Sequence, residues 1–348
     1  GTRVSCIPMD SMDAGTGRGV HTCLEVRPCE GALQPGLACG VEKRTAVGMR
    51  DRNHLAAADV VDLGFFAGLF DGHRGGSCAN YVARQFSNLL HSAYVKRTQA
   101  VKGGMASLTT KAEAELISET LRGAFEAADH SFMKAAKEKH WTDGSSALVA
   151  LLAHGFEAPG KATVMGTEGG VAKLFLAWCG DSRALLLRGK EVLRLTKDHT
   201  PGRKDEYTRI KEAGGKVLDF DGVLKVGRYD KYKERKTSGS FKDLLWLPTC
   251  RSFGDIRLKV PYPVVTSEPE LLVHTLTPED WAVVLICKGI TRTLSDQDVA
   301  DACWAKALEG PVEMAKELVH RAEARGPREP QVNLTAVVMR LGWAGPQP

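Results

Sequence analysis

The chain has 348 residues, of which 43% are hydrophobic and 26% are charged, and its formal net charge is +5. This balance is typical of a globular protein with a sizeable core, and it excludes an intrinsically disordered chain. A net charge of +5 is too small at this length to indicate nucleic-acid binding by itself. We therefore expect a folded protein that binds no nucleic acid.

The apolar segments and the cysteines indicate where such a protein would work. The longest apolar run, around Ala147–Ala153, is much shorter than the ~18 residues that a membrane-spanning helix needs. No apolar core of a signal peptide follows the N-terminus. The nine cysteines are odd in number and lack paired Cys-x-x-Cys spacing, which favours free thiols. We expect a soluble protein of the cytoplasm or another reducing compartment, without a membrane span.

The first part of the chain changes from an irregular pattern to strand and helix patterns. Residues 1–35 show no sustained hydrophobic period, so we expect an irregular N-terminal arm. Leu55–Phe70 is an apolar segment of β type that ends at Asp71. Apolar residues then recur at helical spacing over Tyr81–Leu90 and again over Leu116–Phe132. These two stripes predict a pair of helices that face the core.

The middle of the chain is predicted to consist mostly of strands. Short apolar runs are separated there by glycines and polar turns, at Ser146–Ala153, Ala162–Gly166, Val171–Cys179 and Ala184–Arg188. A short helix is predicted at Glu206–Ala213, where the glycine pair that follows provides a stop signal.

The last third is predicted to contain two strands with two helices between them. Trp281–Cys287 and Leu334–Leu341 are the apolar strand segments. Ser295, with an acidic residue three positions later, has the spacing of a capping box and marks a helix start. Pro311 suits the first turn of the next helix, and Gly326 suits its end.

Pairs of helices set among mostly antiparallel strands indicate an α+β fold rather than a βαβ Rossmann sheet. No linker divides the chain, so we expect one domain over residues 36–342. Residues 219–245 interrupt it as a basic flap: between Lys225 and Lys242 there are seven basic residues and two acidic ones. This flap is either a solvated surface loop or a segment that docks a partner or an anion.

Two short motifs carry the candidate chemistry. Asp71 ends a predicted strand in front of a glycine-rich turn, which exposes a carboxylate and backbone carbonyls together and suits Mg²⁺ or Mn²⁺. Asp181, in Cys179-Gly180-Asp181-Ser182-Arg183, repeats this arrangement at another strand end. Neither motif alone distinguishes a metal site from an ordinary turn.

In combination and in this order, the motifs resemble the successive signatures of the metal-dependent type-2C Ser/Thr protein phosphatases. They are Phe70–Gly76, Asp143–Ala147, Cys179–Ala184, Lys197–Pro201, Arg209-Ile210 with Ala213–Gly215, Arg251–Asp255 and Ser267–Glu270. The resemblance runs from about Gly40 to Leu341. It implies a four-layer αββα sandwich, in which two antiparallel sheets pack face to face with a helix pair outside each. It also implies two Mg²⁺ or Mn²⁺ ions whose bridging water attacks phosphoserine or phosphothreonine.

The resemblance assigns metal-binding roles to three residues that match the family pattern. Asp71 corresponds to the metal-bridging aspartate and Gly72 to a carbonyl ligand. Asp181 corresponds to an acid used for an additional, loosely held metal. Asp51 keeps the second acid of an early Glu-Asp pair in the family.

Other functional positions of the family carry different residues here. The first acid of the Glu-Asp pair falls on Arg50. The family's Asp-Gly-x-Trp-Asp stretch aligns with residues 288–292, which places Lys288 at a ligand position, and a late ligand aspartate falls on Val332. The phosphate-binding arginine falls on Ala46, with Arg44 close but out of register.

These replacements make the expected site more positive by two charge units at Arg50, two at Lys288 and one at Val332, five in all. At about 4 Å and an effective dielectric of ~20, each like-charge contact costs roughly 4 kcal/mol per unit pair. Asp71, with Asp181 nearby, cannot offset that cost for two divalent ions. We therefore expect no metal or at most one weakly held Mg²⁺ or Mn²⁺ ion, with two ions as the alternative, and we assign no catalytic residue.

The replaced positions could instead bind phosphate or a partner, and Arg50, Lys288, Arg44 and His73 are the candidates. Arginine in particular pairs strongly and in a bidentate manner with phosphate. Lys288 could also form an ion pair with Asp71, which is the pairing we favour because a buried cation needs a partner.

The sequence thus favours a pseudophosphatase that acts in protein interaction or regulation, with a protein or phosphoprotein partner. One alternative is an active Mg²⁺/Mn²⁺-dependent phosphatase of phosphoserine and phosphothreonine. Another is a phosphopeptide reader that uses Lys288, Arg50 and the basic flap.

Overall fold

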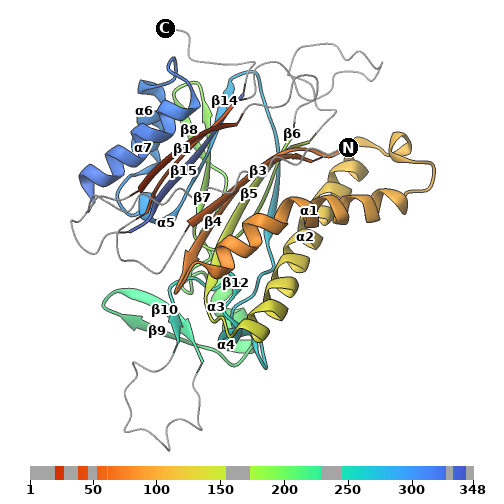
Figure 1. The fold of residues 1–348 in the computed structure, drawn as a ribbon, viewed down its shortest axis with the longest axis vertical. Coiled ribbons are helices and arrows are strands. Elements are labelled where there is room, and N and C mark those ends of the chain that lie inside the picture. Colours follow the sequence, from red (N-terminus) through yellow and green to blue (C-terminus); the bar gives the residue numbers. More distant parts are fainter. Residues whose placement is uncertain are drawn as a thin grey trace, which may run out of the picture.

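Two antiparallel sheets form the centre of the molecule, and helices cover the outer face of each (Figure 1). The computed structural model describes residues 20–26, 38–45, 53–60, 62–153, 173–228, 245–326 and 332–341. The β14 sheet has the strand order β1 (Val20–Val26), β2 (Ala38–Thr45), β15 (Leu334–Arg340), β14 (Asp280–Ile286), β7 (Arg183–Arg188), β8 (Glu191–Arg194). The β5 sheet has the order β13 (Glu270–Thr275), β6 (Lys173–Cys179), β5 (Gly144–Ala153), β4 (Gly64–His73), β3 (Asn53–Val60), and β12 (Phe253–Gly254) pairs with β5.

Strand β4 shows how the layers are held together, because its side chains alternate between the two faces of the sheet. Phe65, Ala67 and Leu69 belong to the core between the two sheets. Phe66 and Phe70 point to the opposite face and pack against helices α1 (Ser77–Gln99) and α2 (Thr110–Lys139). The apolar stripes of both helices predicted from the sequence are therefore core-facing.

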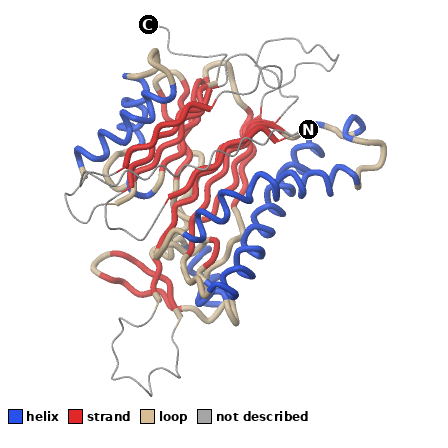
Figure 2. The backbone as a smooth tube through the Cα atoms, viewed as in Figure 1, coloured by secondary structure: helices blue, strands red, loops and turns tan. Residues whose placement is uncertain are grey.

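Helices α6 (Asp296–Ala305) and α7 (Pro311–Arg325) cover the β14 sheet on the opposite side of the molecule. Figure 2 shows helices on the outer side of each of the two groups of strands. The α+β class with two antiparallel sheets is thus confirmed, and the layers follow the predicted αββα order. The capping box at Ser295 is present, and Pro311 occupies the first turn of α7. None of the helices in the described part of the chain is long and apolar enough to cross a bilayer.

A third, small sheet lies outside the sandwich and consists of β9 (Lys216–Phe220), β10 (Val223–Gly227) and β11 (Trp246–Leu247). Helix α3 (Lys204–Glu212) precedes it, and the short helices α4 (Ile256–Lys259) and α5 (Lys288–Thr291) and the 3₁₀ turn η1 (Met105–Ser107) complete the fold. The first part of the predicted flap is therefore a β-hairpin. Residues 229–244, with most of its basic side chains, lie outside the described residues.

Two expectations need correction. Strand β1 lies inside residues 1–35, which we expected to be irregular, and it pairs along its whole length with β2 at the edge of the β14 sheet. The single apolar segment predicted at Leu55–Phe70 is a hairpin of β3 and β4, because Asp62 adopts a left-handed φ of 61° and turns the chain. The strand predicted at Ala162–Gly166 falls outside the described residues.

Candidate functional site

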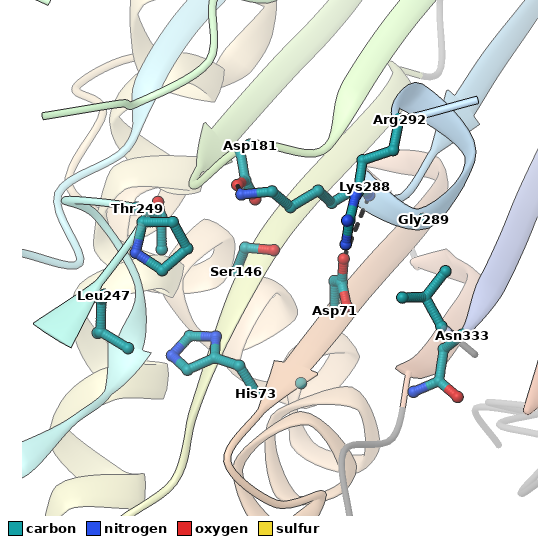
Figure 3. Close-up of a pocket in the computed structure, with 13 residues that line it drawn as sticks. Asp71, His73, Ser146, Asp181, Leu247, Thr249, Lys288, Gly289, Arg292 and Asn333 are labelled. Carbon is teal, nitrogen blue, oxygen red and sulfur yellow. Dashed lines mark hydrogen bonds and ion pairs between the residues drawn. The ribbon is translucent and has the colours of Figure 1, made fainter. Parts of the chain in front are cut away.

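A pocket of about 170 Å³ opens where the ends of β4 and β5 meet the turn after β6, helix α5 and the entry to β15. Figure 3 shows the labelled side chains that converge on it from these elements. Its lining residues are Asp71, Gly72, His73, Ser146, Asp181, Leu247, Pro248, Thr249, Lys288, Gly289, Arg292, Val332 and Asn333. The two sheets thus bring together segments that are far apart in the sequence.

Asp71 lies near the end of β4, at the point where this strand leaves the core between the sheets. Burial raises the pKa of its carboxyl group from 3.8 to about 7, and the negative charge of Asp181 adds to the shift. A hydrogen bond from the backbone N–H of Lys288, at 3.3 Å, acts in the opposite direction. The carboxyl group of Asp71 is therefore only partly ionised at neutral pH.

The side chain of Lys288 crosses the pocket and binds Asp181 (Figure 3). Its ammonium group forms an ion pair with Oδ2 of Asp181, whose side chain is 9% exposed, whereas that of Lys288 is 38% exposed. The ion pair that we expected between Lys288 and Asp71 is therefore wrong. The backbone N–H of Lys288 already lies at Asp71, so the long side chain extends past that carboxylate to the next one.

The turn that carries Asp181 is held rigidly by His199. Nδ1 of His199 accepts a hydrogen bond from the Gly180 N–H at 3.0 Å, and the His199 N–H donates to the Gly180 carbonyl at 2.9 Å. Complete burial lowers the pKa of His199 to about 4, which keeps the imidazole neutral and Nδ1 free to accept. Gly180 has a φ of +118°, a conformation that favours glycine. Asp181 is thus fixed by its neighbours.

His73 belongs to a second polar cluster, which lies beside the pocket. Its Nε2 is 2.7 Å from Oδ2 of Asp255, which is fully buried and also accepts a hydrogen bond from Ser252 at 2.6 Å. Burial opposes the charged imidazolium, but the charge and hydrogen bond of Asp255 outweigh it and raise the pKa of His73. A Cβ atom at Gly144 would lie 2.6 Å from Nε2 of His73, so a glycine is required there.

The family model described as "Protein phosphatase 2C" matches residues 38–329. This chain belongs to the protein phosphatase 2C family. It is 27% identical to "Probable protein phosphatase 2C 59" of Arabidopsis thaliana, over 89% of this chain and 80% of the relative. It is 28% identical to "Protein phosphatase 2C 16" of the same plant, over 75% of this chain, but spans less than half of that relative, 45%.

Solved structures show the same fold. The serine-threonine phosphatase 2C from Toxoplasma gondii superimposes with a TM-score of 0.71 over 93% of this chain and 99% of the other, at 20% identity. A C. elegans sex determining protein superimposes with a TM-score of 0.64 over 88% of this chain and 65% of the other. The fold of this chain is that of a protein phosphatase 2C domain.

The pocket of this protein phosphatase 2C domain contains six of the residues predicted for the site, which are Asp71, Gly72, His73, Asp181, Lys288 and Val332. Ala46 and Arg50 lie outside the described residues, and of Arg44 only the backbone position in β2, opposite His21 and Leu334, is described.

Arg292 is a pocket residue that our sequence reasoning did not single out. It occupies the last position of the stretch that aligns with the family's Asp-Gly-x-Trp-Asp, so a second acid of that stretch is replaced by a cation. The signal was therefore present in the sequence, at the opposite end of the same motif as Lys288.

Proposed function

We propose that this chain is a pseudophosphatase, a protein phosphatase 2C domain that does not assemble a two-metal centre and acts by binding a protein partner. The observation that carries the proposal is the ion pair of Lys288 and Asp181 inside the pocket. An ammonium group that is covalently part of the chain takes up the negative charge that would otherwise attract a divalent ion.

The electrostatic argument concerns a metal ion placed between Asp71 and Asp181. Such an ion would lie close to the ammonium group of Lys288, and at about 4 Å and an effective dielectric of ~20 one pair of unit like charges costs roughly 4 kcal/mol. A divalent ion doubles that cost. Binding the ion would therefore require Lys288 to leave Asp181, which removes the partner of its charge.

The donor set supports the same conclusion. Mg²⁺ requires near-octahedral oxygen ligands, and binding of two such ions depends on several carboxylates. Asp71 and Asp181 are the carboxylates of the pocket lining, and Gly72 offers a carbonyl, whereas the side chain of Val332 offers no donor. Within the described ranges, no group of three or more His, Cys, Asp and Glu side chains is placed to hold a metal ion. These residues do not fit a two-metal centre.

Activity with Mn²⁺ tests the proposal against the alternative of an active phosphatase. The protein is incubated with a phosphoserine peptide and a phosphothreonine peptide in millimolar Mn²⁺, and released phosphate is measured beside the Asp71→Asn variant. We expect both proteins to release phosphate at the same background rate. Turnover by the unmodified chain that Asp71→Asn abolishes would establish the active phosphatase and end the pseudophosphatase proposal.

The basic flap remains a proposed partner-binding segment. Two of its cations are in the described residues, and both have structural roles. Lys225 lies 5.0 Å from the centre of the Phe220 ring, and Arg228 donates a 2.6 Å hydrogen bond to the carbonyl of Val260. Any docking charge of the flap would therefore come from the basic residues between Arg228 and Lys242. A protein partner and a reducing compartment likewise stay predictions.

A further inference from the structure

The connection between α5 and α6 presents a serine and an arginine to solvent. Ser295 directly precedes α6 and is exposed, and Arg292, three residues before it, is exposed as well. Leu294 between them is buried and anchors the connection in the core. Protein kinases select substrates by the charges around the acceptor hydroxyl group, and an arginine three residues before a serine is a pattern that basophilic kinases select. This pattern is therefore present on the folded surface.

The structure distinguishes this copy of the pattern from the others in the chain. Arg-x-x-Ser occurs four times in the sequence. Ser87 follows Arg84 at the same spacing, but its side chain is buried within α1. Ser77 is partly buried in the first turn of α1, and Ser238 lies outside the described residues. Among the copies that the structure describes, only Ser295 is exposed.

The two aspartates that follow Ser295 are bound by arginines of other elements. Nε of Arg194, at the end of β8, lies 2.6 Å from Oδ2 of Asp296. Nη1 of Arg325, at the end of α7, lies 2.6 Å from Oδ1 of Asp298. These ion pairs reduce the repulsion that the two carboxylates would exert on a phosphoryl group at Ser295.

Arg292 differs from these arginines because, within the residues that the structure describes, no carboxylate pairs with its guanidinium group. A kinase that approaches this surface meets an unpaired cation before Ser295 and paired acids after it. Complementary charge then favours a basophilic kinase, whose substrate site is acidic, over an acidophilic one.

The arginines around the start of α6 also supply donors for a phosphate on Ser295. A guanidinium group has five N–H donors in a planar fork, and the side chains of Arg194 and Arg325 are exposed beside their aspartates. A phosphoserine carries about −1.5 to −2 charges at neutral pH and three strong acceptor oxygens. Asp301, one turn further along α6, accepts a 2.9 Å hydrogen bond from Gln297. A phosphate at this position therefore has cations within its own turn and the adjoining elements.

We propose that Ser295 is a phosphorylation site for a basophilic protein kinase, with Arg292 as the residue that the kinase recognises. The kinase transfers the γ-phosphoryl group of a nucleoside triphosphate to Oγ of Ser295. The Oγ–P bond forms, the bond from the γ-phosphorus to the β–γ bridging oxygen breaks, the hydroxyl proton passes to a base of the kinase, and the nucleoside diphosphate leaves. The site goes beyond the proposed function, because here the chain is the substrate of another enzyme.

The modification changes both the capping box and the pocket. It removes the hydroxyl proton that Ser295 donates to Oδ2 of Asp298 at 2.6 Å. A dianion then faces that carboxylate, so Asp298 leaves the capping box and the phosphate accepts from the first-turn N–H groups in its place. Arg292 lines the pocket, and a phosphate three residues along the chain draws its guanidinium group away from it. Phosphorylation of Ser295 therefore lowers the positive charge of the pocket.

The test treats the whole folded chain with MgATP and a basophilic kinase selective for arginine three residues before the acceptor, and mass spectrometry locates the phosphate. Ser87 is the internal control, and peptides of residues 81–92 and 289–300 show that both patterns are recognised when they are unfolded. We expect both peptides to be phosphorylated, whereas the folded chain carries phosphate on Ser295 and not on Ser87. A folded chain without phosphate on Ser295 would overturn the proposal.

Arg292→Gln tests the kinase recognition, and Arg257→Gln is its matched control. Arg257 is an exposed arginine of α4 that no serine follows at this spacing. Because hydrogen bonds to charged groups contribute ~1.5–3 kcal/mol, we expect Arg292→Gln to slow phosphorylation of Ser295 at least about tenfold. Arg257→Gln should leave the rate unchanged, and thermal unfolding checks that both variants are folded. An unchanged rate for Arg292→Gln would overturn the assignment to a basophilic kinase.

The Asp71→Asn variant, phosphorylated in parallel, separates this site from the proposed function. An active phosphatase would remove its own phosphate, whereas a pseudophosphatase retains it. Equal phosphate on Ser295 in both chains supports both proposals. Phosphate that accumulates on Ser295 only in Asp71→Asn would refute the pseudophosphatase and leave the phosphorylation site established. Absence of phosphate from Ser295 in both chains would refute the phosphorylation site alone.

Discussion

Lys288 holds Asp71 with its backbone and Asp181 with its side chain. The N–H of Lys288 donates to Oδ2 of Asp71 at 3.3 Å, and the ammonium group binds Oδ2 of Asp181. One residue of α5 thereby connects the end of β4 to the turn after β6, on which the two acids lie. Because Lys288 is covalently part of the chain, its cation cannot diffuse away from the two carboxylates as a metal ion can.

The first prediction concerns the contribution of this bridge to stability. Lys288→Met keeps much of the side-chain volume and leaves Asp181 without its partner. A fully buried pair that loses one partner costs about 3–5 kcal/mol and an exposed pair about 0–1 kcal/mol. Because Lys288 is 38% exposed and Asp181 only 9% exposed, we expect a loss of about 1–3 kcal/mol in the free energy of unfolding, measured with urea.

Lys111→Met provides the control for the loss of a lysine from an ion pair. Lys111 lies 3.9 Å from Glu115 on the surface of α2, and its side chain is 88% exposed. This substitution should change the free energy of unfolding by less than about 0.5 kcal/mol. A cost for Lys288→Met that is no larger than this control would mean that the bridge does not stabilise the fold.

The second prediction restores the acids of the family pattern. The variant Arg50→Glu, Lys288→Asp, Val332→Asp makes the site five charge units more negative than in this chain. We expect it to bind Mn²⁺ detectably in calorimetry and more tightly than the unmodified chain, for which we expect at most one weakly held ion. Adding Asp71→Asn to the triple variant is the control, and it should remove the restored binding. A triple variant that folds and stays without bound Mn²⁺ would refute the charge argument.

The third prediction concerns the glycine beside the His73–Asp255 pair. A Cβ atom at Gly144 would come within 2.6 Å of Nε2 of His73 and against the carboxylate of Asp255, both of which are fixed by their hydrogen bond. We expect Gly144→Ala to lower the free energy of unfolding by about 1–3 kcal/mol, the usual cost of overpacking. Urea unfolding measures this loss.

Gly123→Ala in α2 is a matched substitution with the opposite expectation. The atoms nearest to a Cβ there, at 2.9 Å, belong to the guanidinium end of Arg97, which is flexible and can move away. Because alanine is favoured over glycine inside a helix by up to about 1 kcal/mol, this variant should be neutral or more stable. If both variants lose the same stability, the tight space at Gly144 is not the cause of its effect.

The sequence predicts those parts of the fold whose signal is local. The apolar stripes of α1 and α2 and the capping box at Ser295 each depend on residues within one element, and both features are present. The β9–β10 hairpin was not predicted, because each strand has only five residues and, of the apolar side chains in β10, Val223 and Leu224 are exposed whereas Val226 alone is buried. Strand β1 likewise depends on pairing with β2 rather than on a period of its own.

The residues that form the site could be predicted from the sequence, but the ion pairs between them could not. The order of motifs identifies Asp71, Asp181 and Lys288 as neighbours, which the pocket confirms. Which acid Lys288 binds depends on where the first backbone N–H of α5 lies relative to Asp71, and no sequence pattern contains that distance. The same holds for His73 and Asp255, which are 182 residues apart and meet only because β12 pairs with β5.

The last prediction is a pH dependence that originates at His199. Its pKa is lowered to about 4 in the folded protein from an ordinary value of 6.5, mainly because the imidazole is buried. Between these two values the unfolded chain binds more protons than the folded one, so stability is complete above pH 6.5 and falls as the pH decreases toward 4. The lowering of this pKa from 6.5 to about 4 corresponds to a loss of about 3 kcal/mol. His199→Asn retains an acceptor for the Gly180 N–H but cannot be protonated in this range, so its free energy of unfolding should fall less steeply between pH 6.5 and 4.

His130→Asn is the control, because His130 is an exposed histidine of α2. This variant should have the same dependence of stability on pH as the wild type. Equal slopes for the wild type and His199→Asn would show that the imidazole is not the group that titrates.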